Sequence, residues 1–388
     1  MYNLETTMTY QKLYIPENLD MALLDGMRKE YKYKVLFFVS SIYFCRVTNK
    51  RNCGEFIPLS QEFLHRFIDC HFVKRVRDDL LRLGVIEVDS SGKRGTKGNG
   101  CLGYKFTEKY ANQHFKTVTN PYPKKKEPIE MKNPAHKYLL EQLKQITILP
   151  EAEDEIENII NEELDLYRDA VHARNCALIS THWIQDADWF FKVDRKTGRV
   201  FHNVCNLHKR VRPFLRYKGM PLVEVDISNC QPLLLYSLYP DKGADEARRY
   251  LELVESGKFY EVLQVLCDAP DREKFKKQFY SYLFSPNYWQ TKAGEVFKNH
   301  FPELAAVIYE MKKDEYNALA LALQQLEADL VITAVVPILA QKGIPIVTIH
   351  DSIATLPECV EEVKKVIQTE CFRLYGIAPS IKEKAAPR

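Results

Sequence analysis

The fold of this chain is decided by two short apolar runs, Val223-Glu224-Val225-Asp226-Ile227 and Ile346-Val347-Thr348-Ile349-His350-Asp351. β-Branched residues in runs of this length predict buried strands. An aspartate at the end of such a strand is held at a fixed place on the sheet. Two of them on adjacent strands would form a site for hard divalent cations, which prefer oxygen ligands.

A third block lies between the two runs and carries Arg272, Lys276, Tyr280 and Phe284 at every fourth position. In a helix this spacing places all four side chains on one face. Such a face can neutralise a triphosphate and stack on a base. Two aspartates that bind two metal ions opposite a cationic helix are the equipment for in-line nucleotidyl transfer.

The three blocks resemble, in order and spacing, the motifs of family A DNA polymerases and single-subunit phage-type RNA polymerases. The first motif matches Asp226, Ser228 and Gln231, the second matches the helix of Arg272, and the third matches His350-Asp351. Two further segments agree in order, Thr197-Gly198-Arg199 with Asn206-Leu207, and Gln324-x4-Asp329-Leu330. The resemblance covers residues 190–385 and rests on five motifs in the right order rather than on any one of them.

The resemblance implies a metal cofactor and its ligands. Two Mg²⁺ ions, for which Mn²⁺ can substitute, would be held by Asp226, Asp351 and the backbone carbonyl of Ile227. One ion would activate the attacking 3′-hydroxyl, and the other would steady the leaving pyrophosphate.

The resemblance also implies roles for the residues of the cationic helix. Arg272 and Lys276 would grip the triphosphate, and Lys276 suits protonation of the leaving pyrophosphate. Tyr280 would touch the incoming sugar and base, and Phe284 would stack beside the templating base.

Further contacts to nucleic acid follow from the same resemblance. His350 would lie near the primer terminus. Arg199 would contact the backbone of the primer or template, and Arg210 and Arg212 could do the same.

Sugar choice depends on residues where the two kinds of enzyme differ. Gln231 stands where the DNA enzymes carry a glutamate that blocks a ribose 2′-hydroxyl and the RNA enzymes carry glycine. Phe284 lacks the hydroxyl that either kind of enzyme has at its position. Ser352 replaces the glutamate usual in the DNA enzymes and matches the RNA enzymes. The bulk of Gln231 favours deoxynucleotides.

The amino-terminal part has its own pattern. Residues 58–106 read as a helix, a second helix over 71–81, a strand, a basic glycine-rich loop and a returning strand. This order is typical of a winged helix, which binds DNA or docks on proteins. Its candidate phosphate contacts are Lys74, Arg75 and Arg77 on the second helix, and Lys93, Arg94 and Lys97 in the loop.

These readings predict four regions in an α+β chain. A winged-helix nucleic-acid-binding domain would span 1–120, with its first 22 residues irregular. A linker rich in Pro and Lys follows over 121–133. A helical connector over 134–190 could hold duplex like a thumb or serve only in packing. Residues 191–388 would form a palm, built on an antiparallel sheet, with helical fingers.

Composition supports a nucleic-acid partner and a reducing compartment. Residues 1–135 hold 23 Lys and Arg against 15 Asp and Glu, whereas the remainder holds 32 against 37. A basic part next to an acidic, aspartate-bearing part fits a module that grips nucleic acid joined to one that uses metal. The 10 cysteines contain no Cys-x2-Cys pair, so we expect reduced thiols. The start lacks a signal-peptide pattern, and no apolar run approaches membrane-spanning length. We therefore expect a cytoplasmic protein with no membrane partner.

Together these observations favour a minimal DNA-directed DNA polymerase whose partners are a DNA template and nucleoside triphosphates. Its small size would suit a phage or another mobile element. One alternative keeps the fold but makes RNA, as a primase or small RNA polymerase. Another is a winged-helix replication initiator with an inactive palm, although both aspartates, the arginine and the lysine are present.

Overall fold

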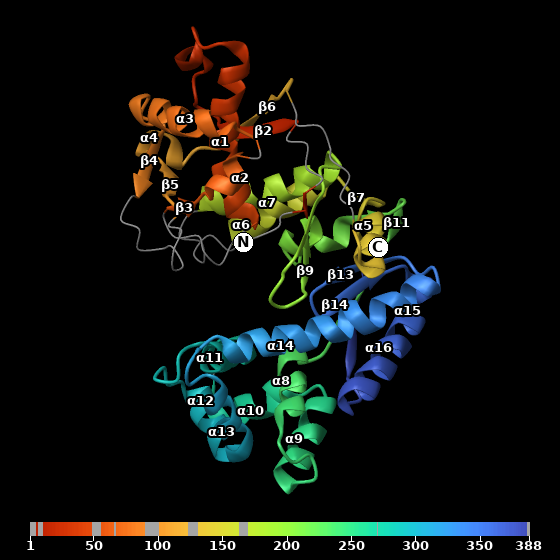
Figure 1. Ribbon diagram of the computed structural model, residues 1–388. Coiled ribbons are helices and arrows are strands. Elements are labelled where there is room, and N and C mark those ends of the chain that lie inside the picture. The colour runs from red at the N-terminus through yellow and green to blue at the C-terminus, as the bar shows by residue number, and fades with distance from the viewer. Residues whose placement is uncertain are drawn as a thin grey trace.

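The structure, a computed structural model, describes residues 5–6, 11–48, 56–65, 67–89, 101–122, 131–162, 170–269 and 271–385. Lys93, Arg94 and Lys97, the predicted loop contacts to phosphate, lie outside the described residues. Helices combine with small antiparallel sheets, so the α+β class predicted from the sequence is confirmed. In Figure 1 the elements α1–α4 lie at one end of the molecule and α8–α16 at the other.

The amino-terminal part is built on a long buried helix and a small sheet of strand order β3-β5-β4. The Ser60 hydroxyl accepts a hydrogen bond from the Phe63 amide (3.1 Å) and so caps the start of α2. Gly84, at a φ of +65°, ends the turn after α3. The elements are α1 (Lys29–Thr48), β3 (Ile57–Pro58), α2 (Gln61–His65), α3 (Cys70–Arg82), β4 (Ile86–Asp89), β5 (Gly103–Phe106) and α4 (Glu108–Ala111).

The segment predicted to be irregular, residues 1–22, contains a strand, so that expectation was wrong. β2 (Lys12–Pro16) pairs antiparallel with β6 (Phe115–Thr119). Leu13, Tyr14 and Ile15 are buried in the amino-terminal core. Three apolar residues at the start of a chain carry too little pattern to reveal a partner strand about 100 residues away.

The connector between the two ends contributes to both hydrophobic cores. Ile179 and Trp183 pack into the amino-terminal core, while Leu178 and Ile184 belong to the other. β1 (Glu5–Thr6) pairs with β8 (Phe190–Val193), and β7 (Ile146–Ile148) pairs with β10 (Leu215–Tyr217). The other elements of this region are α5 (Pro134–Leu143), α6 (Ala152–Glu162), α7 (Ala170–Gln185), β9 (Val200–His202) and β11 (Met220–Pro221).

The carboxy-terminal part centres on an antiparallel sheet of strand order β13-β14-β12-β15, which we call the site sheet. Its strands are β12 (Val223–Ile227), β13 (Ile346–Ile349), β14 (Ser352–Thr355) and β15 (Ile381–Ala385). The long helix α16 (Val360–Tyr375) packs against β12 and β14. Alternation along β12 buries Val225 and Ile227 and leaves Glu224 and Asp226 partly accessible.

Helices surround this sheet. Among them, α14 packs against both α8 and α11, and so joins the sheet region to the helical region. The helices are α8 (Cys230–Leu235), α9 (Asp245–Glu255), α10 (Phe259–Cys267), α11 (Arg272–Phe284), α12 (Lys292–His300), α13 (Pro302–Met311), α14 (Ala318–Ala328) and α15 (Val336–Gln341).

The helical stretch from Ala318 to Gln341 is both long and apolar. It comprises α14, the π-helical segment Asp329–Val335 and α15. By length and composition alone these 24 residues could cross a membrane, contrary to the expectation that no apolar run approaches that length. Half of its most apolar window is buried within the protein. Packing against α8, α11 and α16 gives this apolar composition a structural reason.

Candidate functional site

The structure brings Asp226 and Asp351 together on the site sheet. Asp226 lies on β12 directly opposite Ser352 of β14, and Asp351 immediately precedes Ser352. The Ile227 amide donates a hydrogen bond to the Asp351 carbonyl oxygen (3.3 Å). Both aspartates and Ile227, the predicted metal ligands, therefore lie within one small region of the sheet.

The turn that carries Asp351 is short and strained. Ile349 pairs with Ser352, so His350 and Asp351 alone form the hairpin turn. His350 has a φ of +58°, a conformation that hairpin turns usually give to Gly or Asn. For another residue it costs about 1 kcal/mol or more. The His350 ring packs edge-on against Phe201, with centroids 5.2 Å apart, and this tight turn fixes the place of Asp351.

Negative charge accumulates around Asp351. Burial, with the carboxylates of Glu327 and Asp226, raises the pKa of Asp351 to about 7. A carboxyl group surrounded in this way holds a proton more readily than usual unless a cation compensates. The site therefore favours a cationic ligand.

The four residues predicted to share a helix face do so on α11. Asp271 caps this helix by accepting a hydrogen bond from the Lys274 amide (2.7 Å). Phe275 and Phe279 are buried on its core side. The predicted face is half-buried and consists of Arg272, Lys276, Tyr280 and Phe284.

The cationic groups of α11 are held by neighbours on α10 and on α11 itself. The Arg272 Nε donates to Glu261 (2.8 Å), and its guanidinium lies 5.1 Å from the centre of the Tyr260 ring. The Lys276 ammonium lies 5.5 Å from the Tyr260 ring and 5.6 Å from the Tyr280 ring. Aromatic faces attract cations, so these contacts hold both charges on one side of the helix.

Tyr280 links the cationic helix to the acidic site. Burial raises its pKa to about 12, and the negative charges of Asp351 and Glu327 contribute to that increase. Its ring lies 5.6 Å from that of Phe284. The aromatic end of the α11 face is therefore within the electrostatic influence of Asp351 and of Glu327, and Glu327 belongs to α14, which packs against α11.

A buried carboxylate, Glu327 of α14, is a part of the site that the sequence did not predict. It is 2% exposed and forms an ion pair with Arg199. The Gln231 side-chain amide donates to the same carboxylate (Nε2 to Oε2, 2.7 Å). Three segments far apart in the sequence thus meet at one oxygen atom. The only available signal was an isolated glutamate within a helix that is otherwise uncharged.

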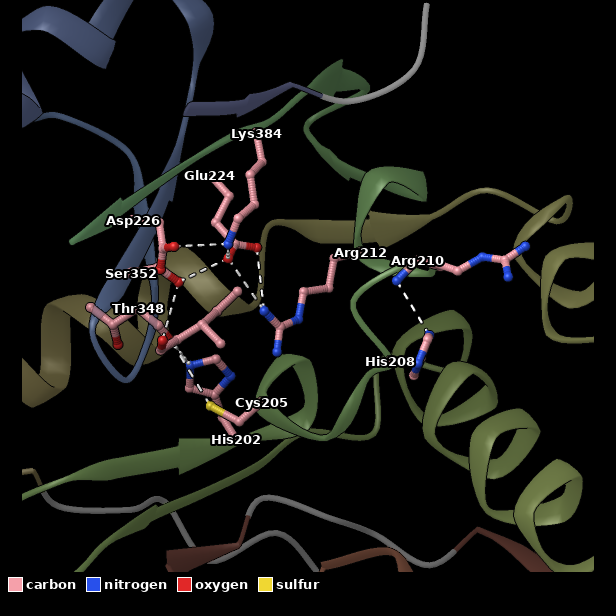
Figure 2. Close-up of polar contacts among 11 residues, drawn as sticks. His202, Cys205, His208, Arg210, Arg212, Glu224, Asp226, Thr348, Ser352 and Lys384 are labelled. Carbon is pink, nitrogen blue, oxygen red and sulfur yellow. Dashed lines mark hydrogen bonds and ion pairs between the residues drawn. The ribbon is translucent and has the colours of Figure 1, made fainter. Parts of the chain in front are cut away.

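Lys384 of β15 is a second unpredicted neighbour. Figure 2 shows its ammonium group between two carboxylates of β12. It lies 2.9 Å from Asp226 Oδ2 and 3.5 Å from Glu224 Oε1. Glu224 also accepts from the Ser352 hydroxyl (3.1 Å). Cross-strand charge pairing stabilises the sheet edge, and it places a positive charge beside Asp226.

The three arginines predicted to contact nucleic acid all form ion pairs within the protein. Arg199 is buried and pairs with Glu327. Arg210 pairs with Glu155 (2.6 Å) and Glu162 (2.5 Å) of α6. Figure 2 shows Arg212 beside Glu224, at 3.3 Å. Arg199 is 9% exposed, so its contact to a nucleic-acid backbone would require rearrangement.

On the amino-terminal part, the predicted phosphate contacts lie along α3. Lys74 and Arg75 are exposed, and Arg77 is partly exposed. The Arg75 guanidinium lies 4.8 Å from the centre of the Tyr31 ring, and Arg77 pairs with Asp78 (2.9 Å). This face of α3 is accessible to a polyanion.

Within the described ranges, no three His, Cys, Asp or Glu side chains converge as a metal-binding group. The donor set of Asp226, Asp351 and a backbone carbonyl is nevertheless suited to Mg²⁺, which is often held by one or two carboxylates together with substrate phosphates. The accumulated negative charge around Asp351 fits such an ion.

No protein-family model matches the chain, and a comparison with curated proteins finds no match. Among solved structures, the chain is similar to the POL domain of Pol1 from M. smegmatis in complex with DNA primer-template and dNTP. The identity is 12% and the TM-score 0.47, over 66% of this chain and 70% of that one. A similarity this low assigns no function.

Proposed function

We propose that this chain is a template-directed nucleotidyltransferase, most simply a DNA-directed DNA polymerase. The observation that carries the proposal is that Asp226, on β12, and Asp351, in the turn just before the facing strand β14, lie in one small region. The charge of Asp351 acts on Tyr280, which shares a helix face with Arg272 and Lys276. Phosphoryl transfer depends on positioning and charge stabilisation more than on covalent chemistry. This arrangement combines anionic metal ligands with cationic triphosphate ligands.

The metal ligands in this proposal are Asp226, Asp351 and the Ile227 carbonyl. Divalent ions bound there would activate the 3′-hydroxyl and stabilise the developing charge on the leaving pyrophosphate. Lys384, whose ammonium group lies 2.9 Å from Asp226, partly balances the carboxylate charge of the site sheet. In the proposed complex a metal ion would share Asp226 with this lysine.

The nucleotide ligands are supplied by α11. Arg272 and Lys276 would contact the triphosphate, and Lys276 would donate a proton to the pyrophosphate as it leaves. Tyr280 and Phe284, whose rings lie 5.6 Å apart, would contact the sugar and the bases. Both cations are held against the Tyr260 ring, which reduces the entropy lost when they bind phosphate.

In this proposal the amino-terminal part would bind the DNA. Its order of helix, strand, two helices and two strands, with sheet order β3-β5-β4, supports a winged-helix assignment. Exposed Lys74 and Arg75 on α3 would contact phosphates and position the duplex. A domain of this kind would raise the local concentration of template at the site.

RNA synthesis by a primase or small RNA polymerase is the second candidate. Ser352 favours it, because the chain places a hydroxyl rather than a third carboxylate after Asp351, and that hydroxyl is engaged by Glu224. Phe284 also offers no hydroxyl to the sugar.

Primer extension tests the proposal. Wild-type protein is given primed or unprimed templates, Mg²⁺, and either dNTPs or NTPs, and the product sequence is compared with the template. We expect templated extension with dNTPs. Products made only from NTPs would favour the second candidate, and no product under any of these conditions would refute nucleotidyl transfer and favour an inactive palm.

A further inference from the structure

The least expected feature of the site is the buried group formed by Arg199, Gln231 and Glu327. Glu327 is 2% exposed and Arg199 is 9% exposed. Burying two charges is costly, and only good geometry with further hydrogen bonds compensates for it. One such hydrogen bond to the Glu327 carboxylate comes from the side-chain amide of Gln231, at 2.7 Å.

The hydrogen bond to Glu327 fixes which way the Gln231 amide faces. An ionised carboxylate accepts hydrogen bonds and cannot donate them. The Gln231 NH₂ group must therefore face Glu327, and its carbonyl oxygen must face elsewhere. That oxygen is buried and has no hydrogen-bond partner within the described ranges. The side chain is held by one end only, and that end is anchored on an ion pair.

A glutamine side chain without hydrogen bonds does not exclude a substrate group well. It rotates about three bonds and can move aside for a small entropic and energetic cost. Steric exclusion of a substrate group requires a side chain whose conformation is fixed. A hydrogen bond to a buried, charge-paired carboxylate supplies that rigidity, because losing it would leave a polar group unsatisfied.

The group also lies where a nucleotide would bind in the proposed function. Gln231 follows Asp226 by five residues and lies in the first turn of α8. Glu327 contributes to the electrostatic environment of both Asp351 and Tyr280. Glu327 lies on α14, which packs against both α8 and α11, so the amide is held in the region where the helix that follows Asp226 and the cationic helix converge.

We propose that Glu327 is a positioning residue for sugar selection, which immobilises Gln231 as a wall of the nucleotide pocket against a 2′-hydroxyl. This inference rests on the proposed function and deepens it. Glu327 itself does not touch the nucleotide; it acts through Gln231. Arg199 supports the same wall by holding the carboxylate in place.

The test measures kcat/KM for a matched dNTP and NTP pair in primer extension. Glu327→Met removes the acceptor at nearly constant volume, and Arg199→Met/Glu327→Met does so without leaving a charge unpaired. Glu370→Gln is the matched control, since Glu370 is also buried and paired with an arginine, Arg373, but lies on α16. The ratio of the two kcat/KM values does not depend on how much of a variant is folded.

We expect Glu327→Met to raise NTP use relative to dNTP use about tenfold, the lower range for discrimination by packing alone. The control should leave the ratio unchanged. In a Gln231→Gly background, where the wall is gone, Glu327→Met should change the ratio no further. That lack of additivity separates positioning through Gln231 from a general structural effect.

Several results would overturn the inference while leaving the proposed function intact. These are an active enzyme whose ratio is the same in wild type and Glu327→Met, a loss of NTP use in that variant, or an equal effect in the Gln231→Gly background. A wild-type enzyme that incorporates neither nucleotide refutes the proposed function, and the inference with it.

Discussion

Removing Arg199 should destabilise the protein far more than removing a surface arginine. Arg199→Met leaves the Glu327 carboxylate buried without its arginine. The negative charge of Glu327 already contributes to the raised pKa of Asp351. The side chains of the pair are 11% and 3% exposed, so the value for exposed pairs, below about 1 kcal/mol, does not apply. Breaking a buried pair on one side costs about 3–5 kcal/mol.

The double variant Arg199→Met/Glu327→Met should recover part of that loss. Two apolar side chains of similar volume can replace a buried pair at little net cost. Gln231 then lacks its acceptor, which costs about 1–3 kcal/mol. We therefore expect the double variant to be more stable than Arg199→Met by about 2 kcal/mol.

Urea unfolding, followed by circular dichroism and by tryptophan fluorescence, measures both quantities. The matched control is Arg248→Met, because Arg248 and its partner Asp245 are 64% and 86% exposed; its change should stay below about 1 kcal/mol. A loss of stability in Arg199→Met as small as that of this control would contradict a costly unpaired carboxylate, as would a double variant no more stable than Arg199→Met.

Three further outcomes are expected. Replacing both Lys74 and Arg75 by Ala should weaken DNA binding and reduce the slope of log K against log salt by about 2; an unchanged slope would assign α3 to protein partners. Lys276→Met should lower kcat/KM roughly a hundredfold without weakening primer-template binding, measured by fluorescence anisotropy; near-normal turnover would exclude its proposed role. Burial and Lys298 lower the pKa of Lys312 to about 8, so the unfolded chain binds one more proton between about pH 8 and 10. Over that range wild type should gain stability relative to Lys312→Met, and a flat difference would contradict the lowered pKa.

Periodicity in the sequence located the elements that carry the site. The run Glu224–Ile227 alternates between half-buried and buried positions, as a strand with one face on the core does. On α11 the predicted face is half-buried while Phe275 and Phe279 are buried. These local patterns depend only on neighbours within a few residues, and so a single sequence contains them.

Long-range pairing could not be predicted in the same way. Arg199 meets Glu327 across 128 residues, and Lys384 meets Asp226 across 158. The sequence spacing of these residues indicates neither ion pair, because charge pairs across a fold depend on tertiary packing. Arginines that looked free to bind nucleic acid proved to have carboxylate partners for the same reason.

The central claim is that Asp226 and Asp351 together support nucleotidyl transfer, and single-turnover primer extension by Asp226→Asn and Asp351→Asn tests it most directly. Each substitution removes a metal ligand with almost no change in shape. Asp245→Asn, at the exposed start of α9, is the control. We predict that both site variants lose several orders of magnitude in rate while retaining their fold and primer-template affinity, and that the control is fully active. Either site variant retaining more than about a tenth of the wild-type rate would contradict the two-metal assignment.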